Sequence, residues 1–137
     1  MSRISTSILF LSILSFFACD NEEFSQSELL NSYVGIWEVQ RVSGGFTGQG
    51  LPLTFDKIIL SKDGNFAALW RDTIVEEGTY LIYQNSNNQD VIQFDDVRFQ
   101  IHDFTTVDKI IELQEDGKLT MFDTCCLFFA YYFKRSN

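Results

Sequence analysis

Apolar and polar residues alternate with a period of two over most of this chain, which is the pattern of half-buried β-strands. The stretch 35–42 shows it first, because Trp37 and Val39 fall on one face and Glu38 and Gln40 on the other. A tryptophan buries a large apolar area, while its indole N–H needs a hydrogen-bond partner. We therefore predict that Trp37 closes one end of a hydrophobic core.

Two Asp-Gly pairs, Asp63-Gly64 and Asp116-Gly117, separate apolar runs further along the chain. Asp-Gly between such runs is a strong hairpin signal, because glycine readily adopts the positive φ angle that tight turns need. Each pair therefore predicts a β-hairpin. The flanking runs predicted as strands are 57–60, 65–70, 109–113 and 118–122.

Further strands are predicted where apolar residues alternate or cluster between polar segments. In the run 97–102, the alternation predicts that Val97 and Phe99 face inward and that Arg98 faces outward. The remaining predicted strands are 74–83, 91–94 and 127–135, and the polar segment 85–89 is predicted as a loop.

Helical spacing precedes the strands at 24–33, where Ser25 and Glu28 have the spacing of a capping box. About eight strands follow, joined mostly by short turns. A sheet of this size either keeps exposed edges or closes on itself, and closure removes the edges. The predicted fold class is all-β: an antiparallel up-and-down barrel of about eight strands with a short N-terminal helix.

Residues 1–18 have the composition of an export signal, with Arg3 before an apolar run that is shorter than the roughly 20 residues of a membrane-spanning helix. The run ends in Phe16-Phe17-Ala18-Cys19, which resembles the lipobox of bacterial lipoproteins. In that family the cysteine becomes the first mature residue and carries acyl chains. The resemblance implies a signal peptide over 1–18 and a membrane anchor at Cys19. An ordinary secretory signal followed by an unrelated cysteine is the alternative.

Residues 19–28 form an acidic tether between the anchor and a barrel domain expected to span 29–137. The segment 20–23 resembles the acidic export tag that sends some Gram-negative lipoproteins to the outer face of the outer membrane. A solvated spacer is the alternative interpretation. The expected location is the bacterial cell envelope, with the protein anchored by lipid to the outer membrane.

Charge and residue types argue against several classes of function. A net charge of −9 disfavours nucleic acid as a partner. His102 is the only histidine, and its neighbour Asp103 would face the other side of a strand, so no nucleophile, base and orienting group can be assembled. We expect no enzyme activity, no cofactor and no metal. The paired acids at 76–77 and 95–96 are interpreted as solvated charge, with weak calcium binding as the alternative.

Cys125 and Cys126 are adjacent, so on a strand their side chains would point to opposite faces. In an oxidising compartment they could still form a strained vicinal disulfide. The other interpretation is two reduced thiols, one of them buried.

The chain after the leader resembles the lipocalin-like group of small bacterial lipoproteins, which are antiparallel barrels of the calycin class. The resemblance rests on Gly35-Ile36-Trp37, on the short helix before it and on the aromatic and basic run 131–135. It implies that Gly35 and Trp37 close the barrel, and that Lys134 or Arg135 lies over the Trp37 ring.

The resemblance also implies a small apolar ligand inside the barrel, with the glycine-rich segment 44–53 as a lid over its mouth or as a plain connection. A barrel of eight strands is just wide enough to hold one small ligand or to be filled by side chains. Two functions therefore stay open: binding of a small hydrophobic molecule, or a filled barrel that interacts with an envelope protein. The candidate ligand-binding residues are Phe46, Leu51, Trp70, Tyr80, Phe94, Phe99 and Tyr131.

Overall fold

The computed structural model describes residues 21–44, 52–99, 103–125 and 129–137, and it confirms the predicted all-β barrel with an N-terminal helix. The helix begins at Asn21, so it includes part of the segment that the sequence suggested as a tether. The elements are α1 (Asn21–Tyr33), β1 (Gly35–Ser43), β2 (Lys57–Leu60), β3 (Asn65–Trp70), β4 (Thr73–Gln84), β5 (Asp90–Arg98), η1 (Asp103–Thr105), β6 (Lys109–Leu113), β7 (Lys118–Asp123) and β8 (Ala130–Arg135).

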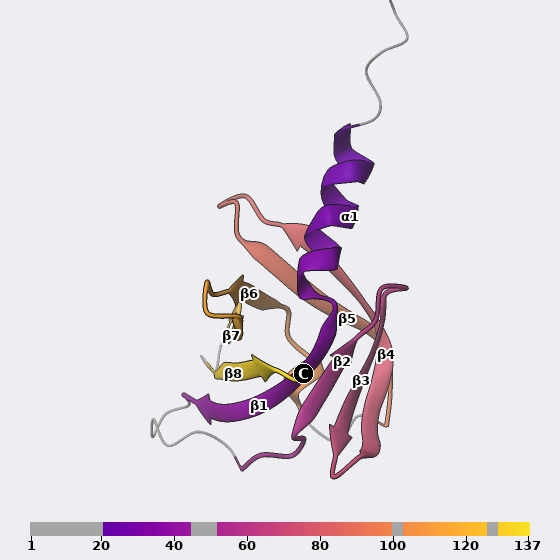
Figure 1. The fold of residues 1–137 in the computed structure, drawn as a ribbon, viewed down its shortest axis with the longest axis vertical. Helices are drawn as coiled ribbons and strands as arrows, with labels where there is room; N and C mark the ends of the chain where they lie inside the picture. The colour runs from indigo at the N-terminus through magenta and orange to yellow at the C-terminus, as the bar shows by residue number, and fades with distance from the viewer. Residues whose placement is uncertain (1–20, 45–51, 100–102, 126–128) are drawn as a thin grey trace, which may run out of the picture.

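Each strand pairs antiparallel with the next one along the chain, and β8 pairs with β1 to close the barrel (Figure 1). Closure gives every strand a neighbour on both sides, which removes the exposed edges of an open sheet. The junctions differ in length. In the part of the chain that the structure describes, β5 and β6 pair at two positions, Val91 with Ile110 and Ile92 with Lys109.

Both predicted Asp-Gly hairpins are confirmed, the first between β2 and β3 and the second between β6 and β7. Gly64 and Gly117 have φ angles of 80° and 77°, which glycine adopts without the steric penalty of other residues. In each turn the glycine N–H donates to a backbone carbonyl, that of Ser61 at 3.1 Å or that of Gln114 at 2.9 Å.

The two ends of the barrel are built differently. The end from which α1 projects carries the short turns 61–64, 85–89 and 114–117, and we call it the α1 end (Figure 1). The longer connections, from β1 to β2, from β5 to β6 and from β7 to β8, leave from the opposite end, which we call the mouth end.

Hydrogen bonds from the barrel fix the C-terminal end of α1. Nε1 of Trp37 donates to the carbonyl oxygen of Tyr33 at 2.8 Å. The guanidinium of Arg135 donates to the carbonyl oxygens of Ser32 and Val34, both at 3.1 Å. Carbonyls at the end of a helix lack partners within the helix, and they favour a nearby positive charge. Because the last turn of α1 contains no basic residue, Arg135 supplies that charge from β8.

The prediction of separate strands at 91–94 and 97–102 is wrong. The structure has one strand, β5, which ends at Arg98 and contains a register shift against β4. Asp96 and Phe99 have φ angles of 48° and 62°, and such angles break the inside-outside alternation of a strand. As a result Phe99 is 67% exposed instead of facing inward. Residues 100–102 lie outside the described part of the chain.

Candidate functional site

Trp37 closes the interior at the α1 end, where it is completely buried. The guanidinium carbon of Arg135 lies 4.4 Å from the centre of its ring, so Arg135 is the basic partner of the two that the sequence offered. Lys134 is exposed and lies opposite Glu38 in the strand register. Gly35 fits this corner because its φ angle is 149° and an added Cβ would lie 3.2 Å from Nη1 of Arg135.

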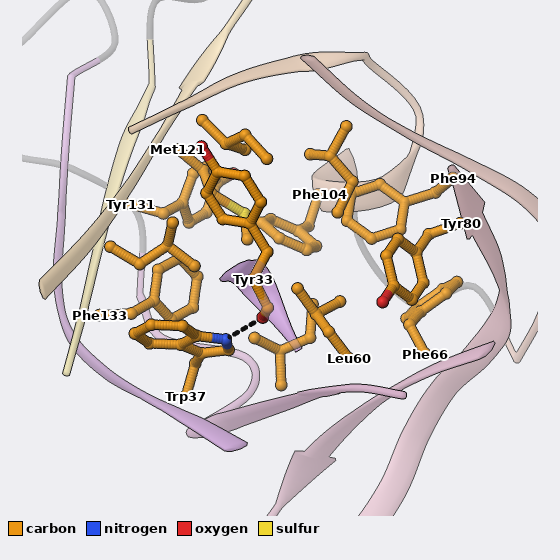
Figure 2. Close-up of a cluster of buried hydrophobic side chains, with 14 of the residues drawn as sticks. Tyr33, Trp37, Leu60, Phe66, Tyr80, Phe94, Phe104, Met121, Tyr131 and Phe133 are labelled. Atoms are coloured by element: carbon orange, nitrogen blue, oxygen red, sulfur yellow. Dashed lines mark hydrogen bonds between the residues drawn. The ribbon is translucent and has the colours of Figure 1, made fainter. Parts of the chain in front are cut away.

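Aromatic side chains, together with aliphatic ones such as Leu60 and Met121, point into the barrel interior, as Figure 2 shows. The ring centres of Phe66 and Phe94 are 4.8 Å apart, those of Phe94 and Phe104 are 5.3 Å apart, and those of Phe104 and Tyr131 are 4.8 Å apart. These distances are typical of aromatic rings in direct contact. The chain's own side chains therefore occupy the interior from β3 across to β8.

Three of the predicted ligand-binding residues, Tyr80, Phe94 and Tyr131, are buried and belong to this interior (Figure 2). The hydroxyl of Tyr80 donates to the carbonyl oxygen of Ser61 at 2.8 Å. Burial, with a smaller contribution from Asp63, raises the pKa of Tyr80 to about 12. The tyrosine is therefore a neutral donor at physiological pH.

The other predicted ligand-binding residues do not join this cluster. Trp70 is exposed at the end of β3, where the guanidinium carbon of Arg71 lies 5.5 Å from the ring centre. Phe99 is exposed at the end of β5. Phe46 and Leu51 lie outside the described residues.

Two buried rings, Phe55 and Phe104, come from connections and not from strands. Phe55 precedes β2, Phe104 lies in η1, and their ring centres are 4.7 Å apart. Both connections belong to the mouth end, so these rings close the interior opposite Trp37. Neither ring is predictable from the sequence, because each is a single aromatic residue between polar neighbours and so gives no periodic signal.

Lys109 is a buried cation on the inner face of β6. Its Nζ lies 2.7 Å from Oδ1 of Asp123, which is also buried, and donates to the carbonyl oxygen of Val107 at 3.2 Å. The ring centres of Phe104 and Tyr131 lie 4.9 and 5.2 Å from the same nitrogen. The ammonium group is thus held by a carboxylate, a carbonyl and two aromatic rings.

Opposing effects act on the pKa of Lys109. Burial lowers this pKa below its ordinary value, while the hydrogen bond to Asp123 and the nearby charges of Asp123 and Asp108 oppose the shift. The sequence contains an indication that Lys109 is buried, because the period of two in a strand puts Lys109 on the same face as Ile111.

The interpretation of 76–77 as a solvated acid pair is wrong for one member. Glu76 is buried on the inner face of β4 opposite Ala68. Glu77 lies on the outer face, where its carboxylate is 3.5 Å from the guanidinium of Arg98. Strand alternation separates the two acids, and only Glu77 meets solvent.

Cys125 is exposed after the end of β7. Cys126 lies outside the described residues, so the vicinal disulfide and the pair of thiols both stay predictions. Among the residues that the structure describes, no group of three or more His, Cys, Asp or Glu side chains is arranged to hold a metal ion.

No protein-family model, curated protein or solved structure matches this chain. The closed barrel therefore rests on the structure, while the resemblance to lipocalin-like lipoproteins rests on the sequence motifs quoted for it. Within the described ranges, no helix has both the length and the apolar character that crossing a membrane requires.

Proposed function

We propose that this protein is a lipid-anchored, non-enzymatic component of the bacterial outer membrane whose barrel acts through its outer surface. One observation carries the proposal: four pairs of rings inside the barrel have centres 4.7 to 5.3 Å apart. A small-molecule site normally needs a cavity of about 300–1,000 Å³. With the interior occupied by aromatic side chains, the outer surface is the part of the protein that can meet a partner in the envelope.

The anchor is supported by the lipobox-like run 16–19, whose cysteine precedes Asn21, the first residue of α1, by two residues in the sequence. Acyl chains on Cys19 would hold the membrane at one end of this helix, while Trp37 and Arg135 hold the barrel at the other end. The acidic segment 20–23 serves either as an export tag for the outer face or as a spacer.

The anchor is tested by Cys19→Ala in the full-length protein expressed in its own cells. We expect the variant to leave the membrane fraction or to accumulate as an unprocessed precursor, while the wild-type protein stays in the membrane. Normal processing together with unchanged membrane retention would refute lipidation at Cys19.

The filled interior is tested by native mass spectrometry of protein purified from its own membrane. We expect the mass of the acylated chain without a bound molecule, and no uptake of a fluorescent fatty acid. The control variant Phe104→Ala removes one of the rings that close the mouth end. If the wild-type protein binds the fatty acid with one-to-one stoichiometry, the proposal of a surface-acting barrel fails.

Binding of a small apolar molecule is the second candidate function, and one observation favours it. Phe55 and Phe104 come from connections, which rearrange more easily than strands. If both rings left the mouth, a ligand would contact Phe94 and Tyr131 in their place. Fatty-acid uptake by the wild-type protein, increased in Phe104→Ala, is the result that would select this function.

A further inference from the structure

A continuous apolar patch lies on the outer wall formed by β1 to β4. Strand register places Ile59 between Ile36 and Ala67, and it places Leu69 opposite Ile74. Ile36 is 42% exposed and Ile74 is 47% exposed. Ile59, Ala67 and Leu69 are half-buried between them, and contiguous apolar residues on an outer wall are a candidate interaction site. We call these five residues the wall patch.

On its β1 side, the wall patch is bordered by net positive charge. Glu38 lies opposite Lys134 on β8, while its other register partner, Lys57 on β2, is compensated by an ion pair of 2.8 Å with Asp72. Arg41 on β1 is also exposed, and its guanidinium lies over the Tyr132 ring at 4.1 Å.

On its β4 side, the wall patch is bordered by net negative charge. Glu77 pairs with Arg98, and Asp95 and Asp96 are exposed beyond them on β5.

Arg71 precedes Asp72 in the turn between β3 and β4, which lies at the mouth end. Arg71 stacks on Trp70, which continues the inward-facing positions of β3 past Ala68. Its charge is therefore directed to the mouth end and not to the outer wall. The difference in sign between the two borders of the wall patch is unaffected.

Opposite charges on the two borders make the wall patch complementary to itself. A two-fold axis that lies in the interface parallel to the strands places the β1 border of one copy against the β4 border of the other. Positive charge then meets negative charge on both sides, and the apolar residues meet in the middle. Away from this wall, two copies of a chain with a net charge of −9 repel each other.

The geometry points to a second copy of this chain as the partner of the wall patch. The inference deepens the proposed function, on which it rests, by naming the surface and its occupant. The same two-fold axis keeps the strands of both copies in one direction, so both α1 helices project from the same side of the dimer. Two chains anchored at Cys19 in one membrane can therefore pair in this way.

The first experiment is photo-crosslinking in intact cells with the full-length acylated chain. A photoreactive amino acid at Leu69, in the centre of the wall patch, should give an adduct of twice the chain mass. The matched control is Leu81, which is 43% exposed on the outer face of β4 but lies outside the patch. An adduct of twice the chain mass from Leu81 but not from Leu69, or an adduct of Leu69 with a different protein, would overturn the inference.

The second experiment measures dimer dissociation by sedimentation of the purified acylated protein in density-matched detergent. We expect Ile74→Lys to weaken the dimer about tenfold or more, and Leu81→Lys to leave it unchanged. Near-ultraviolet circular dichroism from the buried indole checks that each variant is folded. Equal weakening by both variants would count against the wall patch.

A charge swap tests the predicted pairing of borders. Lys134→Glu and Glu77→Lys should each weaken the dimer about two- to tenfold, and the double variant should recover most of the loss. A monomer at every concentration in sedimentation would overturn the dimer but not the proposed function. A dimer that takes up fatty acid would overturn the proposed function but not the dimer.

Discussion

The guanidinium of Arg135 lies over the indole of Trp37, with 4.4 Å between its central carbon and the ring centre. The same group binds two carbonyl oxygens at the end of α1, so one side chain joins the first strand, the last strand and the helix. These contacts help to explain how a helix that projects from the barrel is held to it (Figure 1).

Arg135→Ala removes the cation–π contact and both hydrogen bonds to α1. We expect it to lower the free energy of unfolding by about 1–2 kcal/mol. The matched control Lys134→Ala removes a neighbouring exposed charge and should change stability by less than about 0.5 kcal/mol. Urea unfolding followed by Trp37 fluorescence measures both, and equal effects would contradict the assigned role of Arg135.

Replacing one member of the buried pair Lys109 and Asp123 leaves an uncompensated charge inside the barrel. Lys109→Met and Asp123→Asn should each destabilise the protein by about 3–5 kcal/mol. The double variant should be more stable than their summed effects imply, because it buries no charge and the introduced amide oxygen still accepts from the Phe129 N–H. The measurement is a double-mutant cycle by urea unfolding, and strict additivity would show that the two groups do not act as a pair.

Gly78 allows β4 to approach β5 closely. A Cβ at this position would lie 2.6 Å from the carbonyl oxygen of Asp95 and 3.0 Å from that of Asp96. Gly78→Ala should therefore destabilise the barrel by about 1–3 kcal/mol, visible as a lower thermal midpoint. The control Gly117→Asn occupies open space at a φ angle that asparagine tolerates, and it should cost less than about 1 kcal/mol. If Gly78→Ala left stability unchanged, β4 and β5 would be able to move apart at this position without destabilising the barrel.

Alkaline pH should unfold this protein through its buried tyrosines. Burial is the main cause that raises the pKa of Tyr80 from 10.0 to about 12, and burial with a hydrogen bond to Asp90 raises the pKa of Tyr33 as well. The native state therefore holds protons that the unfolded chain releases, so stability is complete below pH 10 and falls between about pH 10 and 12. The lowered pKa of Lys109 has the opposite effect on stability. It makes the free energy of unfolding rise with pH until the pH reaches 10.5, the ordinary pKa of a lysine.

Unfolding midpoints in urea between pH 8 and pH 12 test this expectation. Tyr80→Phe removes one of the hydroxyls whose pKa is raised by burial and should make the decline shallower. A decline with the same slope in Tyr80→Phe would show that other groups control alkaline unfolding.

Local patterns were sufficient to predict most of the strands, both hairpins and the burial of Trp37, but not the single strand β5. Asp63-Gly64 and Asp116-Gly117 act through turn geometry alone, and alternation locates a strand without any knowledge of its neighbours. The basic partner of Trp37 could be narrowed to two residues but not chosen, because the choice depends on the register between β1 and β8.

The content of the interior could not be predicted in the same way. Phe55 and Phe104 have no periodic context, and Phe99 was misplaced because its positive φ angle breaks the alternation on which its prediction rested. The pairing of Lys109 with Asp123 depends on the register between β6 and β7, where the two residues lie opposite each other. Such contacts are properties of the closed sheet and not of any one segment.

Within the described residues, the junction between β5 and β6 has two register pairs, fewer than any other junction of the barrel, so we expect this junction to open first. β4 and β5 share seven register pairs, so a fluctuation that separates β5 from β6 breaks far fewer ladder hydrogen bonds. Backbone amides of β6 should exchange with deuterium sooner than those of β4, and uniform protection around the wall would rule this out. A chain that opens there exposes two complementary edges, which gives heated protein a route to strand exchange between molecules.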